Sequence, residues 1–362
     1  MSLDDLRKRI NALDERIVAL LDERAGLMGA VLQAKRDAKL PTFDPERERE
    51  VLERLARMGD GRFPAGALRA VFREVMSASR ALQDAVTVAF LGPAGSFSHA
   101  AARRLFGLSA SYQETTTIDG VFDALYRGVA TYGVAPVENS SEGSVTHTVD
   151  ALLESQGRVR IRRELVLDVV QCLMSRAPSV GAVRRVYSHP QALGQCRLWL
   201  AKNLAGAQLV QTPSTSAAAR EAAADTEGAA IGSALAAEIY DLPVLRESVQ
   251  DMATGNATRF IVIAREHAPR TGRDKTTLAF SLKEGRGALK RALEIFEQGG
   301  ISLTRIESRP SRQRAWDYVF LCDLEGHADE APVRAAIDAL GGVCPSVTWL
   351  GSYPAAEGVT AP

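Results

Sequence analysis

Basic side chains on one N-terminal helix are the first candidates for chemistry. Residues 3–35 carry apolar side chains at alternating spacings of three and four, the heptad pattern of a helix that packs against other helices. Arg24 stands where that pattern calls for Val, Ile or Leu. A buried guanidinium without a partner costs on the order of several kcal/mol, so Arg24 is expected to meet an anion. The apolar seam consists of Leu3, Leu6, Ile10, Leu13, Ile17, Leu20, Leu27, Val31 and Ala34.

The spacing of three basic residues says which of them can share one small ligand. Lys35 follows Arg24 by eleven residues, so the two lie on one helix face within ~20° and ~17 Å apart along the axis. Arg7 precedes Lys35 by 28 residues, or ~42 Å of helix, too far to reach the same small molecule in one subunit. If Arg7 joins the site, it must come from a second, antiparallel chain. The alternative is an ordinary exposed arginine.

A second group of candidates follows short β-rich runs in the middle of the chain. Each run ends in a turn of small polar residues and continues as a helix, so hydroxyls and free N–H groups gather at helix N-termini, where anions bind. A single turn of this kind is weak evidence, because Ser and Thr are common N-caps whatever the function. The runs are Val86–Leu91, Gly133–Val137, Val183–Tyr187 and Leu209–Gln211.

The sequence also excludes several kinds of site. Gly92-x-x-Gly95 matches neither a dinucleotide fingerprint nor a P-loop. His99, His147 and His189 are not spaced as metal ligands, and the four cysteines form no C-x-x-C pair. We therefore expect no cofactor, no metal and no disulfide framework.

Composition limits the partners. Lys plus Arg equals Asp plus Glu at 44 each, so no global field attracts nucleic acid or a membrane. The first ten residues contain no apolar segment, and the most apolar run, Leu165–Met174, is interrupted by Asp168 and Gln171. The sequence therefore favours a soluble cytoplasmic protein. At 362 residues with 46% apolar residues, two or three domains are expected.

The elements that must position these candidates fall into three regions of the chain, each with its own secondary-structure pattern. After the first helix, Asp44 is a plausible N-cap with Pro45 at the first helical position, and this second helix runs to about Met58. A third helix ends near Gln83 and carries Ser79 on its apolar stripe. From residue 86 the alternation of strands and helices predicts an α/β sheet.

Beyond a linker at Ala264–Arg273, the C-terminal pattern predicts the βαββαβ order of a ferredoxin-like unit. Residues 351–362 are expected to form a loose tail. The predicted elements are strand Thr277–Leu282, helix Ala288–Phe296, strands Ile301–Glu307 and Trp316–Leu324, helix Ala331–Leu340 and strand Ser346–Leu350.

Residues 3–83 resemble the all-helical chorismate mutase domain. The resemblance rests on Leu6-Arg-Lys-Arg-Ile-Asn-Ala-Leu-Asp14, Glu23-Arg24, Ala34-Lys35, Asp44-Pro-Glu-Arg-Glu48, and Ser79 with Gln83. Members of that family are intertwined helical dimers in which one subunit lends an arginine to its neighbour's site, which is the arrangement that helix length requires of Arg7.

The resemblance implies a role for each matching residue. Chorismate carries two carboxylates and rearranges in one pericyclic step without proton transfer, so catalysis needs a held conformer and stabilised charge on the breaking ether oxygen. Arg7, Arg24 and Arg47 are expected to anchor carboxylates. Lys35 and Gln83 are expected at the ether oxygen, Glu48 at the substrate hydroxyl, and Asp44 and Ser79 in support.

Five ordered motifs at about residues 86–266 resemble the prephenate dehydratase domain. They are Gly92-Pro-Ala-Gly-Ser-Phe-Ser98, Ala135-Pro-Val-Glu-Asn-Ser140, Ser188-His-Pro-Gln-Ala-Leu193, Ser214-Thr-Ser-Ala-Ala-Ala219 and Asn256-Ala-Thr-Arg-Phe260. Members of that family fold as two α/β lobes, like a periplasmic binding protein, with the site between them. Residues expected to line this site are Asn139, Ser140, Ser188, Gln191, Ser214, Thr215 and Arg259.

The dehydratase resemblance puts Thr258 in the catalytic role. Prephenate loses a ring hydroxide and carbon dioxide together as the ring becomes aromatic, so the enzyme must aid hydroxide departure and leave the ring carboxylate free to fragment. Threonine is too weak an acid to transfer a full proton unaided. Thr258 is therefore expected to donate a hydrogen bond to the leaving oxygen; the alternative is a strand threonine with no role.

The C-terminal unit resembles the amino-acid-binding regulatory domain known as ACT. The resemblance rests on Gly287-Ala288-Leu289 and Ile306-Glu307-Ser308-Arg309-Pro310. It implies that paired domains bind phenylalanine, the pathway product, and inhibit the dehydratase, with Gly287, Ala288, Leu289, Glu307, Ser308, Arg309 and Pro310 as effector-binding residues. The alternative is a module that only dimerises.

Together these resemblances predict a multidomain protein with a helical domain at 1–85, a two-lobed α/β domain at 86–266 and a ferredoxin-like ACT domain at 275–352. The predicted function is a bifunctional enzyme of phenylalanine biosynthesis that acts as a homodimer or larger homo-oligomer on chorismate and prephenate. The alternative is a small-molecule sensor with a structural helical dimerisation domain.

Overall fold

The computed structural model describes residues 1–38, 45–58, 61–82, 86–251, 255–283, 285–311 and 318–356. By their internal contacts the residues divide into two compact units, Met1–Thr87 with Arg103–Ser111, and Val88–Ala102 with Tyr112–Pro362. Each unit is described by itself.

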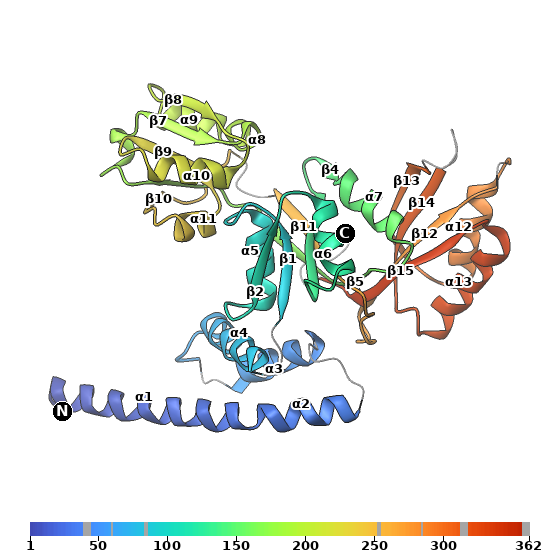
Figure 1. Cartoon of the computed structure of the whole chain (residues 1–362), viewed down its shortest axis with the longest axis horizontal. Helices are drawn as coiled ribbons and strands as arrows, with labels where there is room; N and C mark the ends of the chain where they lie inside the picture. The colour runs from blue at the N-terminus through green and yellow to red at the C-terminus, as the bar shows by residue number, and fades with distance from the viewer. Residues whose placement is uncertain are drawn as a thin grey trace. The chain divides into compact units, whose positions relative to one another are not determined.

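The N-terminal segment of the first unit is all-helical, as predicted (Figure 1). Its helices are α1 (Leu3–Gly26), α2 (Met28–Asp37), α3 (Pro45–Met58) and α4 (Ala65–Ala81). Ser2 caps α1, accepting from the Asp5 backbone while the Asp5 carboxylate accepts from Ser2 in return.

The predicted single helix over residues 3–35 is wrong in one detail, because it is interrupted at Leu27. The Leu27 N–H donates to the Arg24 carbonyl at 3.3 Å, one residue short of the regular α-helical partner, and the regular pattern resumes when Val31 donates to Leu27 at 3.1 Å. Gly26 and Gly29 flank this point, and glycine is a weak helix former. Leu27 nevertheless keeps right-handed helical angles, φ −79° and ψ −14°, so α2 continues the course of α1 (Figure 1).

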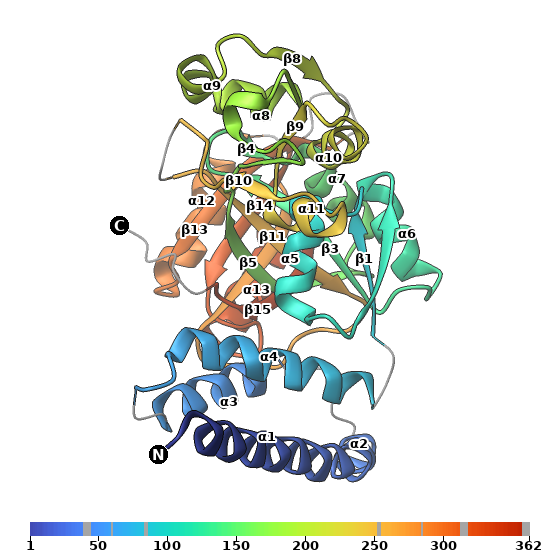
Figure 2. The ribbon, with the colours of Figure 1, turned by 90° about the vertical axis from the view of Figure 1, so that its left-hand side faces the viewer.

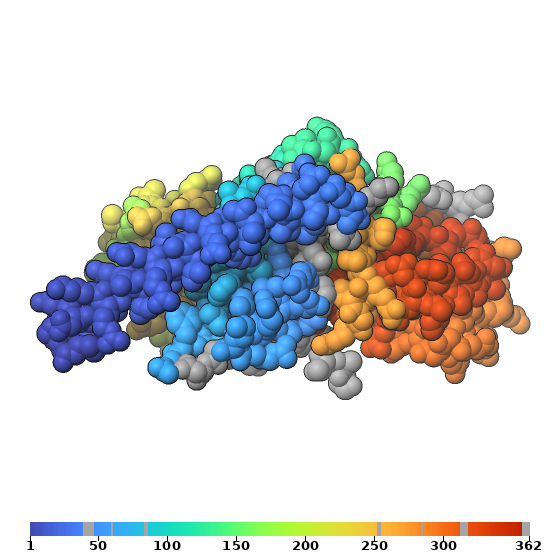
Figure 3. Space-filling model, turned by 90° about the horizontal axis from the view of Figure 1, so that it is seen from below, coloured from blue at the N-terminus to red at the C-terminus, as the bar shows by residue number. Residues whose placement is uncertain are grey.

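The apolar seam of α1 is exposed along its whole length. No residue of α1 is buried, and Ile10, Leu13 and Ile17 are 56%, 53% and 54% exposed. Figure 3 shows α1 and α2, in dark blue and blue, uncovered on the side of the helices seen in that view. A heptad seam stabilises a helix only when a second helix covers it, and nothing in the described part of this chain does so. By contrast, α4 buries Met76, Ser77, Ser79 and Arg80.

The first lobe of the second unit is built on a six-stranded mixed sheet. Its strand order is β2 (Ser111–Thr115), β1 (Thr87–Leu91), β3 (Tyr132–Asn139), β11 (Ala257–Ala264) and β5 (Arg160–Asp168), with β4 (Gly143–Ser144) paired to β3. Strands β1 and β3 are parallel, whereas β11 runs antiparallel to both β3 and β5. Helices α5 (Phe97–Phe106), α6 (Ile118–Tyr126) and α7 (Thr146–Ser155) belong to the same region of the chain.

The second lobe has its own five-stranded sheet, seen apart from the first in Figure 1. Its order is β10 (Val244–Arg246), β6 (Cys172–Ser175), β9 (Gly228–Gly232), β7 (Arg185–Ser188) and β8 (Gln208–Gln211). One 3-10 turn and four helices connect these strands: η1 (Val180–Ala182), α8 (Pro190–Gln195), α9 (Arg197–Asn203), α10 (Thr215–Ala223) and α11 (Ala234–Ile239). In Figure 2 helices α8 and α9 and strand β8 lie at the top of the view. The two-lobed α/β architecture is therefore confirmed. The apolar run Leu165–Met174 is the crossing from β5 to β6.

The C-terminal elements follow the predicted βαββαβ order. They are β12 (Asp274–Ser281), α12 (Ala288–Gln298), β13 (Leu303–Pro310), β14 (Tyr318–Glu325), α13 (Ala331–Val343) and β15 (Val347–Pro354), in a sheet ordered β13-β14-β12-β15.

The prediction of a loose tail from residue 351 is wrong for its first four residues. Strand β15 continues to Pro354, and Tyr353 is fully buried. Gly351 allows this continuation, because it has φ +141° and a Cβ there would lie 2.3 Å from the Ile161 carbonyl oxygen of β5. Only glycine permits both that backbone angle and that approach. The last residues, 357–362, lie outside the described part of the chain.

No described helix is long and apolar enough to cross a membrane. Nor do the described His, Cys, Asp and Glu side chains form a group of three or more that could hold a metal ion.

Burial makes the thiols unreactive, which is directly testable. All four cysteines are free and buried, and burial, with Asp251 and Asp323 nearby respectively, raises the pKa of Cys196 and Cys322 to about 12. Because the thiolate is the nucleophile, we expect the native protein at about pH 8 to react slowly with a disulfide reagent, and the unfolded protein to release the signal of all four thiols at once. Rapid labelling of the native protein would contradict this burial.

Candidate functional site

The helical unit brings together two of the residues predicted for the mutase site. Arg24, in the last turn of α1, donates from a guanidinium nitrogen to the Ser79 hydroxyl of α4. Ser79 is 7% exposed and donates in turn to the Val75 carbonyl at 2.6 Å. The cation in the seam of α1 is therefore half-buried against a polar position of α4, and its remaining N–H groups are available to an anion.

A second pair in the same unit involves an arginine that the sequence interpretation missed. Arg80 is 7% exposed, forms an ion pair with the Glu48 carboxylate of α3, and donates to the Phe106 carbonyl at 2.6 Å. Arg80 follows Met76 by four residues and so lies on its buried face. That spacing was the available signal, since a charged residue on an apolar stripe is the same anomaly that singled out Arg24.

The other predicted mutase residues that the structure describes lie on several elements of the helical segment. Arg7 is exposed and lies 3.7 Å from Asp4 on its own helix, and Arg47 pairs with Glu50 at 3.0 Å. Lys35 is half-buried on α2. Asp44 and Gln83 lie outside the described residues.

In the second unit, sheet register sets the centre of the predicted dehydratase site. Strands β11 and β3 pair so that Thr258 faces Asn139, two residues separated by 119 positions in the sequence. The Asn139 amide donates to the Thr258 hydroxyl oxygen at 2.9 Å and to the Asn256 side-chain oxygen at 3.1 Å. The Asn139 oxygen accepts from the backbone of Ser141 and Glu142, which holds the turn after β3.

Ser140 ties the same turn to the segment before β11. Its hydroxyl donates to the Gly255 carbonyl and accepts from the Ala257 N–H at 2.9 Å. The backbone N–H of Ser140 also donates to the Ala257 carbonyl at 2.9 Å. Asn139, Ser140 and Thr258 are thus one connected group.

The hydrogen bond from Asn139 determines what the Thr258 hydroxyl can do. Thr258 is 9% exposed, and its oxygen is occupied as an acceptor. Within the described part of the chain its proton has no acceptor. A hydroxyl that accepts from an amide can still donate its own hydrogen bond, so the arrangement leaves Thr258 as a donor to a ligand.

The second lobe supplies the remaining predicted residues at the carboxyl edge of its parallel strands. Ser188 ends β7 and is fully buried, with its hydroxyl donating to the Ile231 carbonyl at 2.7 Å. Ser214 caps α10 after β8 by accepting from the Ala217 N–H at 3.0 Å, and Thr215 follows it half-buried. Ligands of α/β sheets bind at this edge.

Two contacts connect this edge to the first lobe. Gln191, at the start of α8, donates to the Glu142 carboxylate in the turn after β3. Ser233, after β9, donates to the Gly95 carbonyl at 2.6 Å. A Cβ on Gly95 would lie 3.0 Å from the Ala236 backbone, which explains the glycine, with its φ of +83°. The sequence interpretation missed Ser233; its signal was a Gly-Ser step after an apolar strand.

Arg259 lies on the other face of β11 from Thr258. Its guanidinium donates to Glu164 and to Asp323, each at 2.7 Å, and to the Tyr353 hydroxyl at 2.9 Å. Asp323 and Tyr353 belong to β14 and β15 of the C-terminal sheet.

The residues predicted to bind an effector occupy two elements of that sheet. Gly287, with φ +75°, precedes α12, and Ala288 and Leu289 begin the helix. On β13, Glu307 and Arg309 share a half-buried face, whereas Ser308 and Pro310 are exposed on the other. Arg309 pairs with Asp150 of α7 at 3.0 Å, and Glu307 pairs with Arg305 at 2.6 Å.

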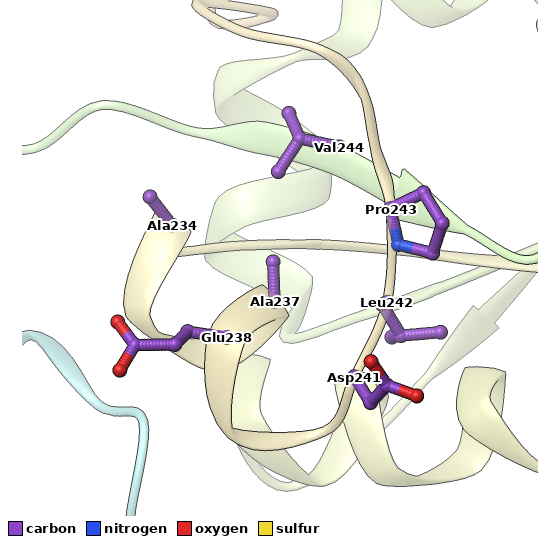
Figure 4. A pocket seen from close by; sticks show the side chains of 7 residues that line it. All are labelled: Ala234, Ala237, Glu238, Asp241, Leu242, Pro243 and Val244. Carbon is purple, nitrogen blue, oxygen red and sulfur yellow. The ribbon is translucent and has the colours of Figure 1, made fainter. Parts of the chain in front are cut away.

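A shallow open pocket lies in the second lobe. It is lined by Ala234, Ala237, Glu238, Asp241, Leu242, Pro243 and Val244, from α11 to the start of β10 (Figure 4). None of the predicted site residues lines it.

Models of three families match consecutive stretches of the chain. Chorismate mutase type II matches residues 6–84, prephenate dehydratase matches residues 88–268, and the ACT domain matches residues 276–342. The order of these matches is the order of the helical segment, the two lobes and the C-terminal sheet.

Known proteins match the chain in whole or in large part. The bifunctional chorismate mutase/prephenate dehydratase of Aquifex aeolicus is 44% identical over 358 residues, 98% of this chain and 98% of that protein. A prephenate dehydratase from Arthrobacter aurescens, solved in complex with L-Phe, matches with a TM-score of 0.68 at 36% identity over 75% of this chain and 90% of its own. A structure described as a novel type of quorum quenching acylase matches with a TM-score of 0.67 at 31% identity, covering 75% and 98%. The chain belongs to the family of bifunctional chorismate mutase/prephenate dehydratases.

Proposed function

We infer that this protein converts chorismate to prephenate and prephenate to phenylpyruvate. The observation that carries this inference is the full-length match to relatives that bear both activities in their name, with the three family models in the same order. We keep the domain boundaries 1–85, 86–266 and 275–352 as part of the proposal. The alternative, a sensor with a structural helical domain, is not favoured, because a scaffold would gain from an apolar residue at Arg24.

In the helical domain the reaction needs cations and hydrogen-bond donors only. Arg24, oriented by Ser79, is proposed to bind one carboxylate of chorismate, and Arg47 another. Lys35 and Gln83 are proposed to stabilise the ether oxygen as its bond to carbon breaks, with Glu48 at the hydroxyl and Asp44 in support. Arg80 holds Glu48 and so fixes the carboxylate that meets the hydroxyl.

The exposed seam of α1 supports a dimer of this domain. Leu3, Leu20 and Leu27 are 63%, 62% and 60% exposed, and a seam of this length matches the buried face of a two-chain helix pair. An antiparallel second copy would cover the seam and bring its Arg7 toward the Lys35 end of this chain. We therefore propose a homodimer, or a larger homo-oligomer built from it, in which each mutase site uses both chains.

In the two lobes the substrate is proposed to lie between Thr258 and the carboxyl edge of β7 and β8. The Thr258 hydroxyl donates a hydrogen bond to the oxygen of the hydroxyl group on the prephenate ring as the bond between the ring carbon and that oxygen breaks. The electron pair of the ring carbon–carboxylate bond enters the ring, carbon dioxide leaves, and the departing hydroxide takes a proton from solvent to become water. The N-terminus of α10, with Ser214 and Thr215, is proposed to hold the side-chain carboxylate. Asn139, Ser140, Ser188 and Gln191 are proposed to complete the site.

The geometry of Thr258 does not favour the acylase activity described for one structural neighbour. A nucleophilic hydroxyl needs an adjacent base to take its proton. Here the partner of the Thr258 oxygen is the amide of Asn139, which donates and cannot accept through that nitrogen. This arrangement suits a hydrogen-bond donor rather than a nucleophile.

The C-terminal domain is proposed to bind L-phenylalanine and to inhibit the dehydratase. The neighbour from Arthrobacter aurescens was solved with L-Phe, and the ACT model covers residues 276–342 here. Gly287, Ala288 and Leu289, with the strand Glu307 to Pro310, are the proposed contacts. The four buried free cysteines fit a reducing compartment, and we propose a cytoplasmic location.

One experiment tests the whole proposal. Purified protein incubated with chorismate is expected to form phenylpyruvate, followed by its ultraviolet absorbance, with prephenate as the intermediate. Added L-phenylalanine is expected to reduce phenylpyruvate formation and let prephenate accumulate, whereas D-phenylalanine at equal concentration serves as the control. Accumulation of prephenate without phenylpyruvate in the absence of L-phenylalanine would refute the dehydratase, and unchanged rates with saturating L-phenylalanine would refute the regulation.

A further inference from the structure

Strand β11 separates two neighbouring side chains onto opposite faces of the first-lobe sheet. Thr258 contacts Asn139 on the proposed substrate side, and Arg259 contacts Glu164 and the C-terminal sheet on the other. Successive side chains of a strand alternate in this way, so a force on one is transmitted through a single peptide unit to the other.

Every guanidinium nitrogen of Arg259 donates a hydrogen bond. Nε donates to Glu164 at 2.7 Å, one terminal nitrogen donates to Asp323 at 2.7 Å, and the other donates to the Tyr353 hydroxyl at 2.9 Å. The hydroxyl of Thr277 on β12 contacts both of these acceptors. Its oxygen lies 2.7 Å from the Asp323 carboxylate and 2.8 Å from the Tyr353 hydroxyl. These hydrogen bonds hold the planar guanidinium in one orientation, and the two carboxylates balance its charge.

This network lies where the first lobe and the C-terminal sheet already share an apolar core. One cluster contains Ile261 and Ile263 of β11 together with Leu321 and Leu350 of the C-terminal sheet. Asp323 and Glu164 have side chains 1% exposed, and Arg259 is 13% exposed. Removing the Asp323 charge leaves Arg259 with Glu164 at 2.7 Å and Glu138 at 3.7 Å, so the guanidinium keeps compensating charges but loses its charged anchor in the C-terminal sheet.

The charges of the pair reinforce one another. Burial favours the neutral form of Asp323, but Arg259, Arg305 and the Thr277 hydroxyl outweigh it, so the pKa of this carboxyl lies below its ordinary value. Burial likewise opposes the charge on Arg259, and Tyr353, Asp323 and Glu164 outweigh that effect, so its pKa lies well above the ordinary value. Both groups are ionised at neutral pH.

The ladder between β3 and β11 is irregular beside Arg259. The register between β11 and β3 shifts after Arg259, which pairs with Glu138, because Phe260 pairs with Pro136 and leaves Val137 between them. An extra residue of this kind bends a strand and is common beside active sites. The ladder from β11 to β5 runs in regular register through Thr258 and Arg259, so this irregularity is confined to the β3 side, where Thr258 meets Asn139.

We propose that Arg259 is a positioning residue of the dehydratase, through which Asp323 and Tyr353 of the C-terminal domain hold β11 so that the Thr258 hydroxyl is aligned with the departing oxygen. The inference rests on the proposed role of Thr258. It assigns Arg259 to alignment of that donor instead of to substrate contact. It also makes the C-terminal sheet part of the machinery of the dehydratase and not only a receptor for an effector.

The test uses residues that cannot touch the substrate. Asp323→Asn removes the charge that faces Arg259, and Tyr353→Phe removes only one acceptor and keeps the ring in the core. We expect the dehydratase kcat to fall ~10- to 100-fold in Asp323→Asn and less in Tyr353→Phe, because small misplacements of a reacting group are costly. In both variants KM should stay within about twofold and mutase activity should be unchanged.

A matched control is available in the second lobe. Arg185, Asp225 and Tyr187 form the same combination of residues, with the Arg185 Nε 2.6 Å and the Tyr187 hydroxyl 2.9 Å from the Asp225 carboxylate. Asp225→Asn should therefore remove a comparable pair without lowering the dehydratase kcat. Arg259→Lys keeps the positive charge but loses the planar guanidinium with its several donors. Its dehydratase activity should therefore lie between that of the wild type and that of Arg259→Gln.

The outcomes separate the two levels of the proposal. Wild-type kcat in both Asp323→Asn and Tyr353→Phe overturns the positioning role, as does an equal loss in Asp225→Asn or a parallel loss of mutase activity. A rise in KM at unchanged kcat in Arg259→Lys would instead make Arg259 a substrate-binding residue. If Thr258→Ala itself retains dehydratase activity, the proposed role of Thr258 fails independently of these results.

Discussion

Replacing Thr258 with alanine is expected to lower the dehydratase kcat by about 10²- to 10³-fold and to leave the mutase untouched. This is the usual loss when one donor that stabilises a developing oxyanion is removed. The donor matters here because the substrate expels hydroxide, a poor leaving group, and the buried hydroxyl of Thr258 is already oriented by the Asn139 amide. Chorismate and prephenate should be supplied separately, so that each activity of the same preparation is measured on its own.

Thr258→Ser and Thr258→Val sharpen this result. Serine keeps the hydroxyl and should retain a substantial part of kcat, whereas valine keeps the shape of threonine without the donor and should be as impaired as alanine. Asn139→Ala should also lower kcat, since it removes the group that turns the Thr258 proton away from Asn139. Dehydratase activity of Thr258→Val near that of the wild type would leave Thr258 as a strand residue without a chemical role.

The second large effect is expected at Arg24. Arg24→Ala should reduce mutase kcat/KM by about 10²-fold or more, because a charge-assisted contact to a substrate carboxylate is lost, while the dehydratase continues to consume added prephenate. Arg16, an exposed residue of the same helix, provides the control: Arg16→Ala should keep both activities. A mutase reaction that survives Arg24→Ala would mean that the anomaly in the heptad seam has a structural cause.

Mixing subunits tests whether Arg7 serves the neighbouring chain. Arg7→Ala and Arg24→Ala proteins should each be weak mutases, yet in a mixed dimer one of the two sites receives Arg24 from one chain and Arg7 from the other. Statistical exchange should therefore restore roughly a quarter of the wild-type mutase rate, as two-fold symmetry of the dimer dictates. Differently tagged chains verify the exchange. Lack of recovery in a verified heterodimer would show that Arg7 and Arg24 do not share a site between chains.

The contacts of Arg259 suggest a route by which a ligand of the C-terminal domain can regulate the dehydratase. The contacts from this domain to the first lobe include the Arg259–Asp323 pair at β11 and the Arg309–Asp150 pair at α7. The start of β11 is hydrogen-bonded to the turn of Asn139 and Ser140, and α7 follows that turn in the chain. A ligand that alters the β13–β14 region can therefore affect the alignment of Thr258 without entering the substrate site.

The sequence alone was sufficient for much of this protein. Heptad spacing identified the helical segment and made Arg24 an anomaly, and the helix rise showed that Arg7 is too distant to share its site within one chain. The alternation of elements indicated an α/β sheet and the βαββαβ unit, and the resemblance carried by the five motifs implied that the α/β region forms two lobes. These are local properties, since periodicity and turn composition depend on residues a few positions apart.

Only the tertiary structure decided which distant residues meet. Thr258 reaches Asn139 because β11 returns antiparallel to β3, and Ser79 and Glu48 are paired with Arg24 and Arg80 by helix packing. The sequence placed Arg259 beside Thr258, and the alternation of a β-strand turned it to the opposite face. Tyr353 stood in an expected tail and became part of the network that holds it. Pairings across a sheet are specified by the whole fold, because the free energy that selects them comes from burial shared among residues far apart in the chain.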